Sequence, residues 1–346
     1  MTDLLLEWLI KIAVIFFILI TVVAYLSYIE RRVASWIQLR VGPNRVGPLG
    51  LLQPLADGLK FIFKEDIIPS QANKWLYIAA PAIAIVPALM TFIVIPYGSE
   101  VNLFGRTVPL RVTQIDIALL YVLAVGSVGV YGVALAGWSS NNKYSLLGGL
   151  RATAQMISYE LSLGISIVGV LLLAGTLDLV EIVEAQRGAW LGFIPKWNIF
   201  LQPFGFIIFF ISALAETNRV PFDLPEAEAE LVAGYFTEYS SMKFAMFFMS
   251  EYFHLITVTS VATTLYFGGW DGPGVDRFPL LSIVYFIIKV FVFIFIFMWI
   301  RFTLPRFRYD QLMRFGWKIL LPGAILNVVI TATLVLFFPN LIAVRP

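Results

Sequence analysis

The chain has 346 residues, of which 60% are hydrophobic and only 13% are charged, and its formal net charge is +2. Soluble domains carry about 25% charged residues, so this composition excludes an ordinary soluble fold. The small net charge gives no indication of nucleic-acid binding. With no cysteine and a single histidine, His254, the chain cannot form disulfides, cysteine-ligated iron–sulfur clusters, a bis-histidine haem or a histidine-rich metal site. Any electrons must therefore come from a partner protein.

Eight apolar stretches follow one another along the chain, each long enough to cross a hydrocarbon core, which takes about 20 residues. We predict an all-α polytopic membrane protein with about eight transmembrane helices and short interfacial helices, forming one domain over residues 1–346. The first stretch is too long for the core of a signal peptide, and no small-x-small cleavage site precedes Glu30, so we expect it to remain as a span. The predicted spans are residues 4–28, 75–95, 115–138, 156–175, 198–215, 244–267, 280–300 and 319–338.

The positive residues predict the orientation. Most of the 24 lysines and arginines lie in the connections after spans one, three, five and seven. The positive-inside rule places these loops on the cytoplasmic side, or on the matrix side of a mitochondrion, and both termini on the opposite, periplasmic side. An even number of spans also requires the two termini to share a side.

Two connections have the periodicity of amphipathic helices. In the first, Val33, Trp36 and Ile37 share one helical face, which fits either a helix lying in the membrane interface or a short extension of the first span. In the second, residues 178–184, apolar residues oppose acidic ones, which predicts a short structural helix. No sequence repeat is visible, which disfavours an inverted-repeat transporter.

The first cytoplasmic loop is too apolar to be a free loop. Gly-Pro pairs at Gly42 and Gly47 force turns, and residues 49–63 are rich in leucine and phenylalanine. We expect this segment to pack against lipid, another part of the chain or a partner protein. The last cytoplasmic loop, residues 301–313, is basic and aromatic, and its arginines are interpreted as a positive-inside anchor. These arginines are Arg301, Arg306 and Arg308.

The loop over residues 216–243 is strongly acidic although it lies on the positively biased side. Neighbouring carboxylates raise one another's pKa, so this group can share protons near neutral pH. A solvated acidic loop, or one that binds a basic partner, is the alternative, but the apolar residues between the acids favour a buried, functional loop. The carboxylates are Glu216, Asp223, Glu226, Glu228, Glu230 and Glu238, against Arg219 and Lys243, and the apolar residues are Phe222, Leu224, Leu231, Val232, Tyr235 and Phe236.

Four ionisable residues fall inside predicted spans: Glu160, Glu251, His254 and Lys289. A charge at the centre of a membrane helix costs about 2.5–3.5 kcal/mol, so such groups face protein or water and mark an ion path. Simpler interpretations remain open for each. Glu160 lies about one turn into its predicted span and can reach the interface, and His254 can be a neutral, hydrogen-bonded residue. Lys289 can pair with a carboxylate on a neighbouring helix, for which Glu251 is a candidate.

Five motifs resemble, in order and over nearly the whole chain, the H-type subunit of the bacterial NADH–quinone oxidoreductases, which is the core membrane subunit of respiratory complex I (subunit 1 in mitochondria). The resemblance implies an eight-helix core whose cytoplasmic loops help to build a quinone chamber beneath the peripheral arm. It also implies a chain of carboxylates that links quinone chemistry to proton pumping. The motifs are Arg40-Val-Gly-Pro-Asn44, Ala56-Asp-Gly-Leu-Lys60, Arg151-Ala-Thr-Ala-Gln155 continuing to Glu160, Ala215-Glu-Thr-Asn-Arg219 continuing to Val232, and Pro305-Arg-Phe-Arg-Tyr-Asp-Gln-Leu312.

The resemblance also implies roles for individual residues. The proton-coupling residues would be Glu160, Glu216, Asp223, Glu226, Glu228 and Glu230. The residues that bind quinone or line its chamber and entrance would be Glu30, Arg31, Trp36, Arg40, Asp57, Lys60, Arg219 and Phe222. No residue is expected to bind a metal.

As part of a proton-translocating NADH:ubiquinone reductase, the chain would carry no redox centre of its own. Quinone would be the substrate, while NAD, FMN and iron–sulfur clusters would lie on partner subunits. The expected partners are the peripheral-arm subunits that carry the terminal iron–sulfur cluster, the adjoining membrane subunits of the pump, quinone and lipid, with no nucleic acid. A bacterial inner membrane is favoured over a mitochondrial one.

Three other functions fit parts of the pattern. The membrane-anchor subunit of an energy-converting hydrogenase resembles the same family without using quinone, and its co-purification with a nickel–iron hydrogenase would identify it. A stand-alone proton-coupled transporter would move a solute in liposomes without partners. A purely structural anchor would tolerate neutralisation of all its acids.

Overall fold

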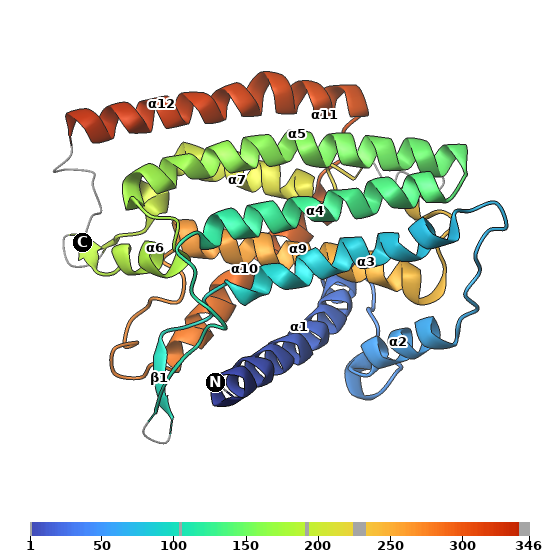
Figure 1. Ribbon diagram of the computed structural model, residues 1–346, viewed down its shortest axis with the longest axis horizontal. Helices are drawn as coiled ribbons and strands as arrows, with labels where there is room; N and C mark the ends of the chain where they lie inside the picture. The colour runs from blue at the N-terminus through green and yellow to red at the C-terminus, as the bar shows by residue number, and fades with distance from the viewer. Residues whose placement is uncertain (1, 104–105, 191–193, 224–232, 339–346) are drawn as a thin grey trace.

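The computed structural model describes residues 2–103, 106–190, 194–223 and 233–338, and its helices are mostly long. The longer helices are α1 (Thr2–Ile37), α3 (Lys74–Met90), α4 (Ala118–Ser139), α5 (Lys143–Ala174), α7 (Pro203–Glu216), α9 (Ser241–Tyr266), α10 (Leu281–Thr303) and α12 (Leu321–Phe337). Most of them run roughly along the long axis of the molecule, whereas α1 and α10 run obliquely to it (Figure 1). The shorter helices are α2 (Gln53–Phe63), α6 (Leu179–Ala185) and α11 (Tyr309–Phe315), with 3₁₀ turns at Pro48–Gly50, Thr91–Ile93, Asn198–Phe200 and Gly234–Phe236.

Two small antiparallel hairpins complete the fold, β1 (Glu100–Leu103) with β2 (Arg106–Pro109), and β3 (Ala189–Trp190) with β4 (Ile194–Pro195). In the first hairpin Glu100 lies opposite Pro109. The amino terminus, the β1–β2 hairpin and α6 lie at one end of the bundle, at the left of Figure 1, and α2 and α11 lie at the other. These are called the hairpin end and the loop end below.

Within the described ranges, seven helical segments are long and apolar enough to cross a membrane. They are α1, α3, α4, α5, α9, α10 and the continuous segment from α11 to α12, which contains one π-helical turn at Gly316–Leu320. Helix α7 is apolar but has only 14 residues, and it occupies the place of the predicted fifth span. The all-α polytopic membrane fold predicted from the sequence is thereby confirmed.

Helix α9 lies in the interior and has the most polar composition of the spanning helices. It can be polar because its hydroxyls bond to the helix itself: Thr259 donates to the Leu255 carbonyl at 2.8 Å, and Thr263 donates to the Thr259 carbonyl at 2.8 Å. Without water in the hydrocarbon layer, an unsatisfied hydroxyl would be costly. A satisfied hydroxyl on a small side chain lets neighbouring helices approach closely.

Close helix packing also depends on glycine. A Cβ at Gly132 of α4 would lie 2.6 Å from the Ala84 nitrogen and 2.9 Å from the Ala80 carbonyl oxygen of α3. Real Cβ atoms do not approach backbone atoms so closely, so only glycine allows α3 and α4 this separation. Lipid tails are as apolar as the side chains, so the hydrophobic effect does not drive helices together in a membrane. This close contact therefore stabilises the helix pair through dispersion.

Two helices extend further than the apolar pattern indicated. Helix α1 continues without a break to Ile37, so Trp36 lies on an extension of the first span and not on a separate interfacial helix. Helix α5 begins at Lys143, well before the predicted start at residue 156. Glu160 therefore lies near the middle of its helix. Hydropathy marks the part of a helix that is apolar, whereas the backbone hydrogen bonds continue through polar residues such as Arg151.

Candidate functional site

Four ionisable residues from three helices meet in the interior of the bundle. This acid-rich cluster comprises Glu160 of α5, Glu216 at the end of α7, and Glu251 and His254 of α9. His254 Nε2 lies 3.0 Å from Glu216 Oε1, and both side chains are mostly buried. Glu160 interacts electrostatically with both of these groups. Glu251 accepts a 3.2 Å hydrogen bond from the hydroxyl of Tyr235.

Two small cavities flank the acid-rich cluster. One, of about 40 Å³, touches Glu216, Glu251 and His254, and the other, of about 30 Å³, touches Glu160, Glu216 and His254. These volumes are the space open to the centre of a water molecule, for which roughly 10–15 Å³ is enough, so each cavity has room for water. His254 Nε2 is close enough to Glu216 for an ion pair but lacks the alignment of a hydrogen bond, and Glu216 Oε2 also accepts none from the described residues. Water in these cavities can satisfy both atoms.

A second cluster surrounds Glu30 near the loop end of α1. Arg219 Nη1 donates to Glu30 Oε2 at 3.2 Å, and Arg301 of α10 pairs with Glu30 Oε1. The hydroxyl of Tyr252 donates to Glu30 Oε2 at 2.6 Å. These four residues are called the arginine-paired cluster. Its carboxylate has two cationic partners, which is the condition under which a buried charge is tolerated.

Arg219 is the most deeply buried cation of this cluster, with only 3% of its side chain exposed. Burial is the largest effect and disfavours its charge, but Glu30, Tyr252 and Glu251 together outweigh it and keep the pKa of Arg219 above its ordinary value. Its guanidinium lies 4.6 Å from the centre of the Tyr252 ring, a favourable cation–π distance. Arg219 also interacts electrostatically with Glu251, so it links the two clusters.

The backbone after α7 is fixed by a buried glutamine. Gln155 of α5 donates to the carbonyls of Ala215 at 2.8 Å and Phe222 at 2.7 Å. The Phe222 ring is buried, with its centre 5.6 Å from that of Tyr159 and 5.5 Å from that of Phe307. The segment from Glu216 to Phe222 is therefore held on α5 and on the chain before α11.

Several acids of the acidic loop have other surroundings. Asp223 is buried and pairs with Arg306 at 2.9 Å. Glu238 accepts a 2.6 Å hydrogen bond from Asn142. The remaining predicted acids and three apolar residues lie outside the described residues; these are Glu226, Glu228, Glu230, Leu224, Leu231 and Val232.

The predicted quinone entrance brings α1 and α2 together. Arg31 of α1 pairs with Asp57 of α2 at 2.8 Å. In the part of the chain that the structure describes, α2 has no buried residue. Phe61 packs against Phe244 of α9, whereas Leu55, Ile62 and Phe63 are exposed and available to lipid or a partner. Trp36 is 66% exposed at the adjacent end of α1.

Two further residues predicted at the entrance lie apart from the charge clusters. The Arg40 guanidinium donates to Gln38 at 2.6 Å, in the exposed turn after α1. The Lys60 ammonium lies 5.2 Å from the ring centre of its neighbour Phe61, on α2. Neither contact reaches Glu30.

The structure corrects the expected pairing of Lys289. Its ammonium donates to three backbone carbonyls, those of Phe267, Gly269 and Asp271, at 2.8–2.9 Å. It does not pair with Glu251. Lys289 instead satisfies carbonyls that turn away from helical geometry after α9, and its ammonium lies 5.1 Å from the ring centre of Trp197. Asp271 offers its carbonyl here, while burial raises the pKa of its carboxyl.

The interpretation of the last cytoplasmic loop as a simple anchor is incomplete. Arg301 pairs with Glu30, and Arg306 with Asp223, so both neutralise buried carboxylates. Only Arg308 fits the original interpretation, because it is 77% exposed and pairs with the exposed Asp310. Composition alone cannot separate these roles, since the acids that the arginines bind are far away in the sequence.

Tyr252 and Gln155 contribute to the site although no role was predicted for either. Each is a polar residue within a mostly apolar helix. A buried polar group in a membrane helix needs a partner, so their presence there was a usable signal. The identity of the partners, Glu30 and the carbonyls after α7, depends on the fold.

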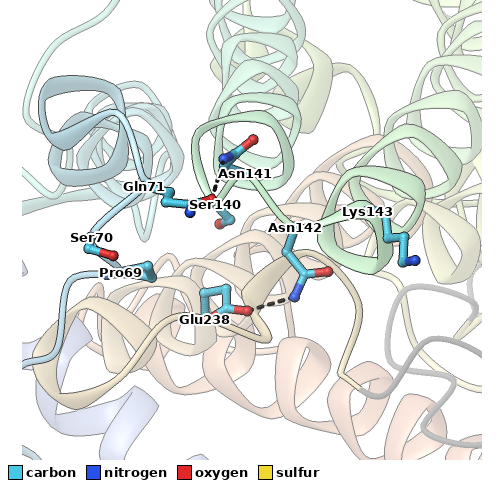
Figure 2. A pocket seen from close by; sticks show the side chains of 8 residues that line it. All are labelled: Pro69, Ser70, Gln71, Ser140, Asn141, Asn142, Lys143 and Glu238. Atoms are coloured by element: carbon cyan, nitrogen blue, oxygen red, sulfur yellow. Dashed lines mark hydrogen bonds between the residues drawn. The ribbon is translucent and has the colours of Figure 1, made fainter.

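A separate polar pocket opens at the loop end, where the segment before α3 meets the turn between α4 and α5 (Figure 2). Its volume is about 540 Å³. Asn142 bonds to Glu238 across it, and Asn141 donates to Gln71 at 3.3 Å. None of the acid-rich cluster lines this pocket, so it is distinct from the candidate site. Its lining is Pro69, Ser70, Gln71, Ser140, Asn141, Asn142, Lys143 and Glu238.

The fold and its two clusters define a polytopic membrane subunit with ionisable groups buried among its helices. The family model described as NADH dehydrogenase matches residues 10–332. The second H-type subunit of the NADH-quinone oxidoreductase of Koribacter versatilis is 54% identical over 344 residues, covering 94% of this chain and 96% of the relative. Its counterpart in Geobacter sulfurreducens is 54% identical over 327 residues with the same coverage, and the first H-type subunit of Cytophaga hutchinsonii is 50% identical over 343 residues, covering 97% and 98%.

The chain belongs to the family of H-type subunits of NADH-quinone oxidoreductase. It is a membrane subunit of complex I from a bacterial membrane, and the other subunits of that complex are its partners. The resemblance found in the sequence motifs is confirmed.

Proposed function

We propose that this chain couples quinone reduction to proton translocation. Its loop end forms the membrane wall of a quinone chamber, and its acid-rich cluster passes protons toward adjoining membrane subunits. The observation that carries the proposal is the meeting of Glu160, Glu216, Glu251 and His254 around cavities with room for water. Ionisable groups buried within a membrane normally serve ion pathways.

The cluster has a continuous arrangement for proton transfer. Glu251 and Glu216 border the first cavity, and Glu216 and Glu160 border the second. His254 touches both cavities and can hold a proton beside Glu216. A proton can therefore pass between carboxylates through His254 or water, with each group returning to its starting charge when the next proton arrives.

The quinone part of the proposal rests on the surface between α1 and α2. The exposed apolar face of α2 and the exposed Trp36 offer a lateral path for an apolar molecule from the membrane. Arg31 and Asp57 hold the two helices together, and Glu30, the residue before Arg31, is buried with its arginines. Quinone would be reduced here by an iron–sulfur cluster on a peripheral-arm subunit. NAD and FMN would lie further away on partner subunits.

Arg219 is the proposed connection between the two events. It is bound to Glu30, interacts with Glu251, and lies three residues after Glu216 on a backbone that Gln155 fixes. A change of charge in the chamber would alter the field at these carboxylates and shift their protons. The acids at 226, 228 and 230 would extend the same response. The charge bias of the loops favours both termini on the periplasmic side of a bacterial inner membrane.

Replacing Glu216 tests the proposal directly. We expect Glu216→Gln to leave the complex assembled but to lower proton pumping and quinone reductase activity, because positioned proton transfer contributes roughly 10²-fold or more to a rate. Pumping is measured by dye quenching in vesicles, and activity by NADH oxidation with added quinone. Glu181→Gln, on the exposed face of α6, is the matched control and is expected to change neither.

Full pumping and full activity in Glu216→Gln would refute the proton-transfer role. Loss of assembly would be resolved with Glu160→Gln, which removes a charge from the same cluster without touching the end of α7. Purification of the chain with a nickel–iron hydrogenase in place of NADH-oxidising subunits would instead support the membrane-anchor alternative.

A further inference from the structure

We propose that Gly126 of α4 keeps open a passage for water between the two small cavities of the acid-rich cluster. The residue has no ionisable group and transfers no proton, so it is a positioning residue. The proposal rests on the proposed proton-transfer function and adds one requirement to it: water must be able to pass between the cavities beside this glycine.

The two cavities share three lining residues, which are Gly126 of α4, Glu216 of α7 and His254 of α9. Beyond these, the first cavity touches Glu251 and the second touches Glu160. Because the shared residues touch both cavities, they mark the place where the cavities adjoin. Glu216 Oε2 and His254 Nε2 are buried there without a hydrogen bond from the described residues. Gly126 is the third shared residue, and it has no side chain to fill the space.

The open side of Gly126 faces the interior of the bundle. Val122 and Val130 lie four residues before and after it, on the same face of α4, and they are only 5% and 8% exposed. Gly126 is nevertheless partly exposed. A Cβ placed on it would meet no other part of the described chain within 4 Å, apart from the adjoining backbone of α4. A larger side chain at this position would therefore extend into the cavities.

Helix packing accounts for another glycine of α4 but not for this one. At Gly132 a Cβ would lie 2.6 Å from the Ala84 nitrogen of α3, so glycine is required there. Gly129 lines only the first cavity, where a Cβ would lie 3.8 Å from the Ala84 carbonyl oxygen, an ordinary contact. At Gly126 no neighbour requires glycine, although glycine destabilises a helix interior relative to alanine. The space that it leaves between ionisable groups is what distinguishes it.

The size and polarity of a side chain at position 126 should therefore decide whether protons pass. An isobutyl group, as in leucine, would occupy cavities that hold only a few water molecules. It would separate Glu251 from Glu160 while leaving every ionisable residue in place, and a proton needs a hydrogen-bonded group or water within reach. The hydroxyl of serine both donates and accepts hydrogen bonds, so it can take the place of a water molecule.

Three substitutions in the complete complex test the inference: Gly126→Leu, Gly126→Ser and the matched control Gly164→Leu. Gly164 lies in α5 and is also partly exposed, a Cβ there would also meet nothing within 4 Å, and it lines neither cavity. Assembly, quinone reductase activity and proton pumping in vesicles are measured for each variant. The activity is measured in H₂O and in D₂O, because a slow proton transfer raises the ratio of the two rates.

We expect Gly126→Leu to assemble but to lose activity and pumping by roughly 10²-fold, the contribution of positioned proton transfer to a rate. Its H₂O to D₂O ratio should rise above that of the unchanged chain, which a general structural defect would not cause. Gly126→Ser and Gly164→Leu should keep activity, pumping and the isotope ratio. If the leucine variant does not assemble, Gly126→Val provides the same test with a smaller apolar group.

Full activity in Gly126→Leu would overturn the inference, as would a loss without a change in the isotope ratio or an equal loss in Gly126→Ser. Glu216→Gln, measured alongside, separates this failure from that of the proposed function. If Glu216→Gln is impaired while Gly126→Leu is fully active, only the passage is wrong. If both variants are fully active, the proton-transfer function is wrong as well.

Discussion

Two clusters of buried ionisable groups lie side by side in this subunit, and their buried charges are compensated in different ways. In the arginine-paired cluster, Glu30 is held between two guanidinium groups and a tyrosine hydroxyl. In the acid-rich cluster, Glu216 and Glu160 interact with a single histidine, whose charge depends on a proton, and Glu251 lines the same cavity as His254. The first is balanced by permanent cations, and in the proposed function the charge of the second changes with the protons that it holds.

Helix α9 supplies residues to both clusters. Tyr252 contacts Glu30, whereas His254, two residues later, contacts Glu216. Residues two apart on a helix point to nearly opposite sides, since each residue turns the helix by about 100°. One helix thus contributes to the two clusters from nearly opposite faces. The comparison predicts that a Glu→Gln substitution destabilises the chain strongly in the arginine-paired cluster and only slightly in the acid-rich cluster.

The largest expected effect comes from breaking the arginine-paired cluster. Glu30→Gln keeps the shape of the side chain but leaves Arg219 buried without its carboxylate. Removing one partner of a buried ion pair typically costs about 3–5 kcal/mol, so we expect a loss of stability of this size. Because the chain has no cysteine, the free energy of unfolding can be measured from the thiol protection of a reporter, Ala213→Cys. Unchanged protection would mean that the cluster does not stabilise the fold.

A smaller effect is expected where the buried acid has an exposed partner. Arg306→Gln leaves Asp223, which is 5% exposed, without the guanidinium now 2.9 Å away. We expect a cost of about 1–3 kcal/mol, the usual penalty when a buried group loses a hydrogen-bond partner. The matched control is Arg308→Gln in the same loop, whose pair with Asp310 is exposed on both sides and should contribute less than about 1 kcal/mol. Equal effects of the two substitutions, measured with the same reporter, would contradict the distinction between them.

The sequence predicted the all-α membrane class and singled out most residues of both clusters. It did so because apolar length, intramembrane charge and the family motifs are local properties. Lys289 is a residue whose partners could not be predicted from the sequence. The sequence shows a lysine inside a span, but its three carbonyl partners are brought together only because the chain turns after α9. Arg301 and Arg306 were interpreted as anchors for the same reason, since their acids lie far away in the sequence.

The smallest expected change in stability provides the sharpest test of the comparison. Glu251→Gln preserves an oxygen that can accept the hydrogen bond from Tyr235 while it removes one of three neighbouring negative charges. Relief of like-charge repulsion offsets the lost attraction to Arg219, so we expect the free energy of unfolding to change by less than about 1 kcal/mol. Proton pumping should nevertheless fall, because the first cavity loses an ionisable wall. If Glu251→Gln instead destabilised the chain as strongly as Glu30→Gln, the acid-rich cluster would also be balanced by fixed cations. Its carboxylates would then have no need of exchangeable protons.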